Sequence, residues 1–109
     1  MVSYFVRYRG TSADPDAFRT YYGTQHASVL RGFPGIRSLV LHAPVAFNDP
    51  CPINSGRTLL LAQMTFDTAA DLDAALRSTA RQDARADFAR FPAFAAEVTH
   101  EAMSAKVIF

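Results

Sequence analysis

Residues 14–35 read DPDAFRTYYGTQHASVLRGFPG and contain the signals for one complete amphipathic helix followed by a turn. Asp14 is a favoured N-cap residue, and Pro15 occupies the first helical position, where a missing N–H is harmless. Gly32 predicts the C-terminal cap, and Pro34 prevents the helix from resuming. This stretch therefore predicts a helix that begins after Asp14, ends at Gly32 and leads through a turn into a strand.

The predicted helix places aromatic and titratable side chains together. Phe18 and Tyr22 fall on one side, together with either Gln25 or His26, at spacings of three and four residues. Gly23 lies in the middle of the helix, where glycine costs about 1 kcal/mol relative to alanine. Such a cost indicates close backbone packing or a slight bend at that point.

Alternating and continuous apolar runs predict four strands around two helical regions. Thr68 and Asp71 have the spacing of a capping box, and Pro92 ends the second helical region. The predicted strands cover residues 2–9, 36–46, 58–66 and 98–109, with loops at 10–13 and 47–57. The order is βαββαβ with the second helix split, which is the α+β ferredoxin-like arrangement of a four-stranded antiparallel sheet with helices on one face.

The predicted strands carry apolar residues on both sides. Phe5 interrupts the polar set of the first strand, and residues 39–41 and 59–61 are continuous apolar runs. A monomer would expose the sheet face that no helix covers, and monomers rarely expose large apolar patches. We therefore expect a homodimer in which two sheets face each other and form a barrel.

The composition excludes several classes of function. Half of the 109 residues are hydrophobic, 19% are charged and the net charge is +1. The longest basic cluster, Arg81, Arg85 and Arg90, is broken by acids and indicates a solvated helix face, not a nucleic-acid footprint. The apolar runs are far shorter than the ~18 residues of a membrane span, and no signal peptide is evident. Cys51 is the single cysteine, so no intrachain disulfide can form. From the length and composition we expect one domain over residues 1–109, located in the cytoplasm, with no nucleic-acid or membrane partner.

The chain resembles the EthD-like family of dimeric α/β-barrel proteins. The resemblance covers nearly the whole chain and rests on the order and spacing of short motifs: Tyr4 and Tyr8, Phe18, Tyr21 and Tyr22, His26, Pro34 and Gly35, Phe66, Leu72 to Leu76, and Ala86, Asp87 and Phe91. It implies a ferredoxin-like dimer that works without a metal or an organic cofactor. Some relatives are encoded with systems that degrade ethers, and others of similar fold isomerise lactones, cyclise polyketides or oxidise polyphenols.

His26 is the strongest candidate for a catalytic residue. A neutral imidazole over a cavity between helix and sheet can accept a proton from a carbon next to a carbonyl, and burial keeps it neutral by lowering its pKa. Tyr22, one turn earlier, would orient the imidazole or donate to a substrate oxygen. The alternative is that both residues only pack, with His26 hydrogen-bonded to the backbone. Tyr4, Phe5 and Phe18 are the candidates for substrate binding, with a place in the ordinary core as the alternative.

The remaining polar candidates carry weaker signals. His42 and His100 lie on two other predicted strands, but the histidines lack the short spacing of a metal-ligand pair, so we expect no metal site. Cys51 lies in a predicted loop and is expected to have no chemical role. Asp87 is expected first at the surface or at a helix cap, and only second in a pocket.

Two functions follow from these candidates. The first is a small cofactor-independent catabolic enzyme that binds an apolar, oxygenated small molecule between helix and sheet. His26 would accept a proton in an isomerase, lyase or monooxygenase-like step, and the resemblance implies a role in ether or aromatic degradation. The alternative is a non-catalytic protein that binds such a molecule for a partner oxidase system. The loop at 47–57 is a candidate lid for either function.

Overall fold

The computed structural model describes all residues, 1–109, as one mixed sheet-and-helix unit. The elements are β1 (Val2–Ser12), α1 (Pro15–Tyr21), η1 (Tyr22–His26), α2 (Ala27–Leu30), β2 (Ser38–His42), β3 (Thr58–Phe66), α3 (Ala69–Leu76), α4 (Thr79–Asp87), η2 (Phe88–Arg90) and β4 (Phe94–Ser104). The strand order in the sheet is β2-β3-β1-β4, and each neighbouring pair is antiparallel. This confirms the predicted ferredoxin-like arrangement.

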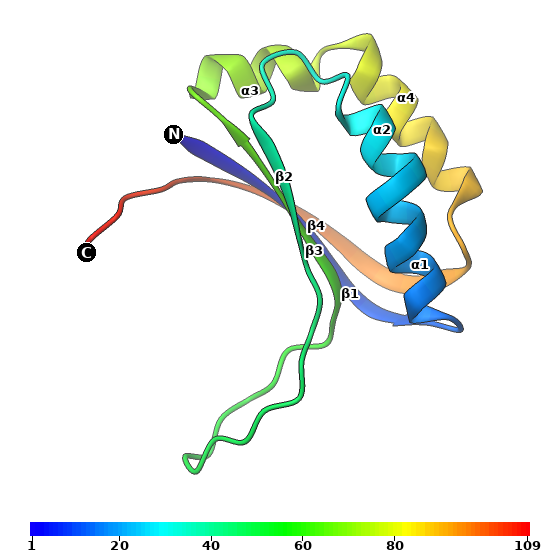
Figure 1. Cartoon of the computed structure of the whole chain (residues 1–109), viewed down its shortest axis with the longest axis vertical. Helices are drawn as coiled ribbons and strands as arrows, with labels where there is room; N and C mark the ends of the chain where they lie inside the picture. Colours follow the sequence, from blue (N-terminus) through cyan, green and yellow to red (C-terminus); the bar gives the residue numbers. More distant parts are fainter.

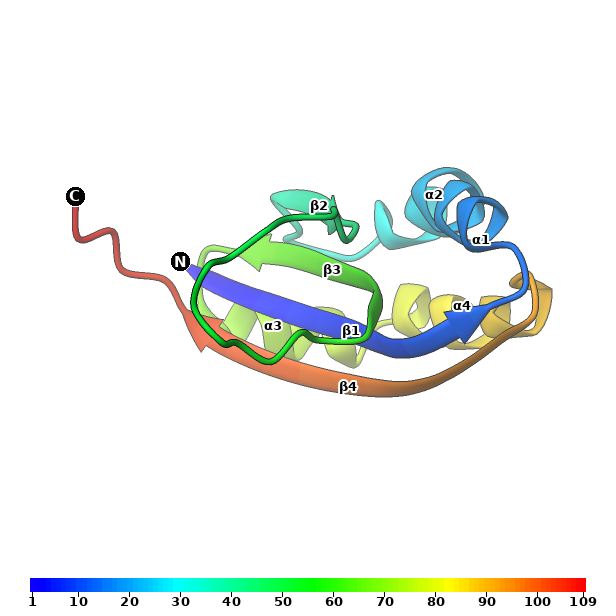
Figure 2. The same ribbon diagram turned by 90° about the horizontal axis from the view of Figure 1, so that it is seen from below.

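Both helical regions cover the same face of the sheet. Figure 1 shows α1 and α2 beside α4 on one side of the curved sheet, while the connection from β2 to β3 and the C-terminal residues project away from it. Seen from below, the strands run from β2 at one edge to β4 at the other (Figure 2). No helix in the structure is long and apolar enough to cross a membrane.

The core forms between the helices and the inner face of the sheet. Alternate residues of β1 face the helices, and their partners on β3 continue the same layer, as in the pairs Tyr4–Met64 and Tyr8–Leu60. Burying a large apolar side chain contributes about 1.5–3 kcal/mol. The largest fully buried side chains are those of Tyr8, Tyr22, Phe18, Phe66, Leu60 and Met64.

The first helical region begins as the sequence predicts and then departs from a regular α-helix. The Asp14 carboxylate accepts a hydrogen bond of 3.0 Å from the backbone N–H of Ala17, which is the expected N-cap. From Tyr22 to His26 the backbone is π-helical, and Gly23 lies within this segment close to Leu41. A π-helical turn inside an α-helix is rare and often lies at a functional site.

The turn after the helix differs in detail from the prediction. The helix ends at Leu30, and Gly32 does not adopt a left-handed conformation. The left-handed residue is instead Gly35, with φ 75°. The motif therefore stops the helix as predicted, but its required glycine lies three residues further along the chain.

The first and last strands differ from the prediction because they pair along their whole lengths. β1 continues through the predicted loop at 10–13 as far as Ser12, which pairs with Phe94. Gly10 permits this extension, because it has φ 150° and a Cβ atom there would lie 2.1 Å from the carbonyl oxygen of Ala95. β4 therefore begins at Phe94 instead of residue 98, and it ends at Ser104, which pairs with Val2 near the start of β1.

The second strand is shorter than predicted. β2 covers Ser38–His42 instead of residues 36–46, whereas β3 covers the predicted residues 58–66. Pro44 follows soon after the end of β2, and proline has no N–H to donate to a sheet ladder. Residues 43–57 are all exposed, so the predicted loop at 47–57 is the middle of a longer exposed connection.

The outer face of the sheet is mixed in character instead of uniformly apolar. Its large apolar side chains are those of Phe5, Val40, Leu61 and Met103, and Val40 and Met103 are 44% and 50% exposed. Polar neighbours such as Gln63 separate them. The strands were expected to carry apolar residues on both faces of the sheet. On the outer face this expectation is correct for the centre and wrong for the residues around it.

Candidate active site

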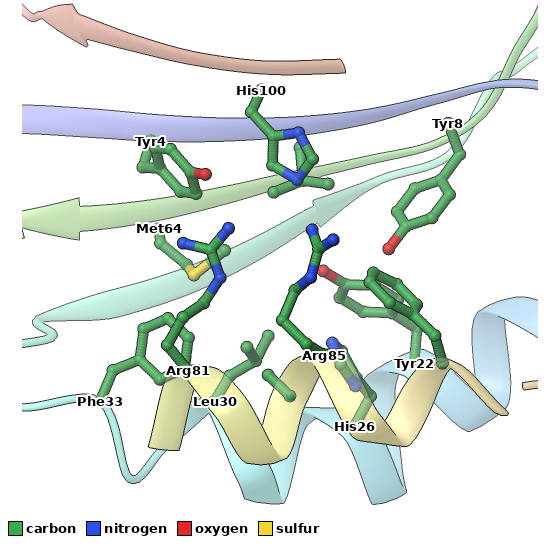
Figure 3. A pocket seen from close by; sticks show the side chains of 13 residues that line it. Tyr4, Tyr8, Tyr22, His26, Leu30, Phe33, Met64, Arg81, Arg85 and His100 are labelled. Atoms are coloured by element: carbon green, nitrogen blue, oxygen red, sulfur yellow. The ribbon is translucent and has the colours of Figure 1, made fainter. Parts of the chain in front are cut away.

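A cavity lies between the helices and the inner face of the sheet. Its free volume is about 30 Å³, room for about one water molecule, so the lining side chains nearly fill it. Nine of the 13 lining residues are hydrophobic. Figure 3 shows the side chains that line it, which are Tyr4, Val6, Tyr8, Tyr22, His26, Leu30, Phe33, Met64, Arg81, Ala84, Arg85, Phe88 and His100.

A buried histidine–carboxylate pair lies at the edge of this cavity. His26 comes from the π-helical segment and Asp87 from the end of α4, so the pair joins the two helical regions. Nδ1 of His26 lies 2.9 Å from Oδ2 of Asp87, and the two side chains are only 3% and 6% exposed. An ionised carboxylate can only accept a hydrogen bond, so Nδ1 carries the proton and Nε2 keeps a free lone pair.

The surroundings of Asp87 keep its carboxylate ionised. Burial acts to raise the pKa of Asp87, but hydrogen bonds from His26 and Tyr21 oppose it, and the resulting pKa is lower than usual. The Tyr21 hydroxyl donates to Oδ1 over 2.8 Å, and Nη1 of Arg90 lies 3.6 Å from the same oxygen. Asp87 is thus available as a fixed acceptor for His26 at neutral pH.

The imidazole of His26 is held in its neutral form. Burial lowers the pKa of His26, and the hydrogen bond and charge of Asp87 oppose this effect only in part. The ring packs edge-to-face on Phe91 with centroids 4.7 Å apart and lies nearly parallel to Phe88 at 5.9 Å. A neutral, oriented imidazole at the edge of an apolar cavity has the properties of a general base.

Two tyrosines bring hydroxyl groups to the same region. The rings of Tyr22 and His26 lie 4.6 Å apart between centroids, and Tyr8 meets Tyr22 edge-to-face at 5.8 Å. Burial raises the pKa of both phenols, so both remain protonated and able to donate. The Tyr8 hydroxyl is fully buried and makes no hydrogen bond of standard geometry within the protein, although the Tyr22 hydroxyl lies close enough to contribute to raising its pKa.

The structure separates the three residues predicted for substrate binding. Tyr4 lines the cavity with His26 and Tyr22. Phe18 is fully buried and packs against Phe91 and Phe94, so it supports the wall without lining the cavity. Phe5 lies on the opposite face of the sheet, because neighbouring residues of a strand point to opposite sides.

Asp87 is the residue whose place differs most from the sequence-based expectation. It was expected first at the surface or as a helix cap, yet only 4% of it is exposed. The sequence did contain a signal, since Asp87 follows the apolar Ala84 by three residues and precedes the apolar Phe91 by four, which is the spacing of residues on one helical face. Arg81 and Arg85 were likewise assigned to a solvated face but line the cavity.

The other polar candidates do not converge. The structure contains no cluster of three His, Cys, Asp or Glu residues that could hold a metal ion. Nε2 of His42 lies 3.0 Å from the Gln63 side-chain oxygen on the outer face, whereas His100 faces the cavity from β4. Cys51 is exposed in the connection between β2 and β3.

The sequence and the fold both match known proteins. The family model of the EthD domain matches residues 11–95. No curated protein matches the chain significantly. Among solved structures, an EthD-family protein from Bacillus halodurans C-125 has a TM-score of 0.72 and 21% sequence identity, covering 97% of this chain and 100% of that chain.

Two further solved structures share the fold at lower identity. SnoaB from Streptomyces nogalater, a cofactor-independent oxygenase, has a TM-score of 0.61 and 12% identity, covering 97% of this chain and 93% of that chain. A dimeric ferredoxin-like protein of unknown function from Thermobifida fusca has a TM-score of 0.63 and 10% identity, covering 95% and 90% of the two chains. At these identities the structural likeness shows the fold alone.

Proposed function

This chain belongs to the EthD family, and we propose that it is a small catabolic enzyme that removes a proton from an apolar, oxygenated molecule bound between the helices and the sheet. His26 acts as the proton acceptor, Asp87 orients it, and the hydroxyl of Tyr22 stands beside it as a hydrogen-bond donor. The reaction would belong to the degradation of ethers or aromatic compounds.

The observation that supports this proposal most strongly is the buried pair of His26 and Asp87. The 2.9 Å contact fixes the tautomer, and burial lowers the pKa of His26, so Nε2 is free to take a proton at neutral pH. Asp87 lies behind the imidazole and is not part of the cavity lining, whereas His26 is. A base held in this way has its proton-accepting atom available to a ligand.

Proton removal is a first step that several reactions share. The carbanion or enolate that it produces can be protonated at another carbon, can expel a leaving group or can react with dioxygen. These outcomes are an isomerisation, an elimination and an oxygenation. Donation from Tyr22 to the substrate oxygen would stabilise the developing negative charge. The proton transfer itself uses side chains of this chain and needs no cofactor.

The experiment follows proton exchange by NMR in D₂O. Phenylacetone and a β,γ-unsaturated lactone serve as probes, because each has an acidic C–H next to a carbonyl and a largely apolar body. The protein should accelerate the exchange of that C–H, and His26→Asn should reduce the acceleration by about 10²–10⁴-fold, the usual contribution of a general base.

His42→Asn is the matched control, since it removes an exposed imidazole from the other face of the sheet. It should leave the exchange rate unchanged. Equal rates for the wild-type and His26→Asn proteins, with both folded by circular dichroism, would remove His26 from the mechanism.

The alternative is a non-catalytic protein that holds such a molecule for a partner oxidase system. The unpartnered hydroxyl of Tyr8 favours it, because a bound oxygen atom would satisfy that group without any chemistry. Saturable binding of the probes with no acceleration of exchange would support this alternative over catalysis.

We also propose that the chain forms a homodimer through the outer face of the sheet. The apolar centre of that face supports this, and so do the exposed apolar side chains of the two projecting segments, Val45, Phe47 and Ile53 in one and Val107, Ile108 and Phe109 in the other. Sedimentation velocity at micromolar concentration tests the proposal, and a single species with the chain mass of 12.0 kDa would contradict it.

A further inference from the structure

Two arginines of α4 line the cavity. Arg81 and Arg85 are one turn apart on α4, and both are among the lining residues. Figure 3 shows both side chains reaching from α4 across the cavity toward the strands, where His100 faces them. The opening is therefore framed by nitrogen-bearing side chains, whereas most of the remaining lining is apolar.

No carboxylate of the chain neutralises these two charges. The ion pairs of the structure involve Arg19, Arg37, Arg90 and His26, and none includes Arg81 or Arg85. Asp83 lies between them in the sequence, but residues two apart on a helix do not face each other. Arg85 packs over the ring of Phe88 at 5.9 Å, which holds the guanidinium in place without cancelling its charge.

The effect of this charge is visible at His100. Burial lowers the pKa of His100, and the positive charges of Arg81 and Arg85 lower it further. The mouth is therefore a region of net positive potential at neutral pH, carried by the two arginines. An arginine side chain presents a planar set of donors that matches the two oxygens of a carboxylate.

Neutral hydrogen-bonding groups lie in the same cavity. The Tyr8 hydroxyl is fully buried and points toward the cavity beside Tyr22 in Figure 3. The neutral imidazole of His26 packs against Tyr22, and it shares the ring of Phe88 with Arg85. A ligand that enters the cavity thus meets both cations and neutral hydrogen-bonding groups.

We propose that the ligand of this cavity is a carboxylate with a small apolar body. Arg81 and Arg85 bind its carboxylate, and its apolar part reaches Tyr8, Tyr22 and His26. The second part of this statement rests on the proposed function, since His26 would act on the end that it meets. The carboxylate subsite itself stands on the arginines alone.

Calorimetric titration with benzoate and benzamide at pH 7 tests the subsite. The two probes have nearly the same shape and differ in charge. The wild-type protein should bind benzoate roughly tenfold or more tightly than benzamide, because hydrogen bonds to charged groups contribute more than neutral ones. The preference should weaken as salt is added, since the mouth is open to solvent.

The Arg81→Gln/Arg85→Gln double variant should lose this preference. Arg77→Gln is the matched control, because Arg77 is an exposed arginine at the end of α3 that does not line the cavity. It removes a positive charge and should leave the preference intact. Equal affinity for the two probes, no saturable binding of benzoate, or an equal loss in the control variant would each overturn the proposal.

His26→Asn separates this inference from the proposed function. It should keep the preference for benzoate, because both arginines remain and the neutral imidazole contributes no charge to the carboxylate subsite. A retained benzoate preference without any acceleration of proton exchange would leave the carboxylate subsite standing and remove the catalytic role. Accelerated exchange without a benzoate preference would support the catalytic role of His26 and remove the carboxylate subsite.

Discussion

His42 lies on the outer face of the sheet and His26 lies in the helical layer over the inner face, and the two imidazoles have very different surroundings. His42 is exposed on the outer face, where it meets the amide oxygen of Gln63 at 3.0 Å. His26 lies on the covered side, where Asp87 contacts it at 2.9 Å and 2% of the residue is exposed. The distances are nearly equal, so the presence of a hydrogen bond does not distinguish them. What distinguishes them is the charge of the partner and the exclusion of water, which together set the tautomer and the pKa.

The same contrast holds for the acidic residues. Asp67 and Arg37 form an ion pair with atoms only 2.6 Å apart, but their side chains are 52% and 64% exposed. Asp87 forms longer contacts, of 2.8 and 2.9 Å, in a place that water hardly reaches. Solvent screens an exposed pair, whereas a buried group that loses its partner cannot turn to water instead. The shorter contact is therefore expected to matter less.

The largest expected effect comes from removing the buried carboxylate. Asp87→Ala leaves the imidazole of His26 and the hydroxyl of Tyr21 without their acceptor and should lower the free energy of unfolding by about 3 kcal/mol. Asp67→Ala removes the exposed pair and should change stability little. Urea denaturation at pH 7 and at one protein concentration compares the two.

Asp87→Asn sharpens this comparison, because the amide keeps an acceptor oxygen but loses the charge. It should recover most of the stability while lowering the rate of proton exchange by roughly tenfold or more, since the neutral partner no longer fixes the tautomer of His26. An equal loss of stability in Asp87→Ala and Asp67→Ala would show that burial does not determine how much each carboxylate contributes to the free energy of unfolding.

The sequence predicted the elements whose signals are local. Asp14 and Pro15 fix the start of the first helix through contacts within one turn, and Thr68 does the same for α3. The pattern of apolar residues predicted both ends of β3 correctly. This strand is hydrogen-bonded to a neighbouring strand on each edge and buried on one face, so its apolar pattern extends along its whole length. The positions of Tyr22 and His26 on one face followed from helical spacing in the same way.

What the sequence did not predict depends on contacts between distant residues. His26 and Asp87 are 61 positions apart, so spacing within each helix cannot indicate that the two side chains meet. The true start of β4 at Phe94 depends on its pairing with Ser12 and on the close approach at Gly10. The π-helical turn lies in a segment whose composition also suits a regular helix, so it follows from packing and not from propensity.

A smaller effect is expected on assembly through the outer face. Phe5 is part of the apolar centre of that face and pairs with Glu101 of β4, so Phe5→Lys gives a lysine with an acidic neighbour in the monomer. The dimer would have to bury the new charge, and its dissociation constant should rise by about tenfold or more. Sedimentation equilibrium measures this change.

Ala86→Lys is the matched control, because Ala86 is exposed on α4 and the substitution adds the same charge away from the sheet. It should leave the dissociation constant unchanged. A Phe5→Lys protein that is folded and associates as strongly as the wild type would place the interface elsewhere and leave the apolar centre of the outer face without a role.

The smallest effect is on how stability depends on pH, and it tests the buried imidazole of His26. Because burial lowers the pKa of His26, the unfolded chain binds a proton at this site at a higher pH than the folded chain does. Stability should therefore fall as the pH drops from the ordinary histidine value of 6.5 toward the lower pKa of the folded state. The lowered pKa of Asp87 acts in the same direction but only in a more acidic range, below its usual 3.8.

The difference in the free energy of unfolding between pH 7 and pH 5 should be smaller in His26→Asn than in the wild type. His100 also has a lowered pKa, but it is present in both proteins, so its contribution cancels. If His26→Asn kept the full pH dependence, the imidazole of His26 would have to titrate in the folded protein as it does in the unfolded chain. The neutral base on which the proposed proton transfer depends would then lose its physical support.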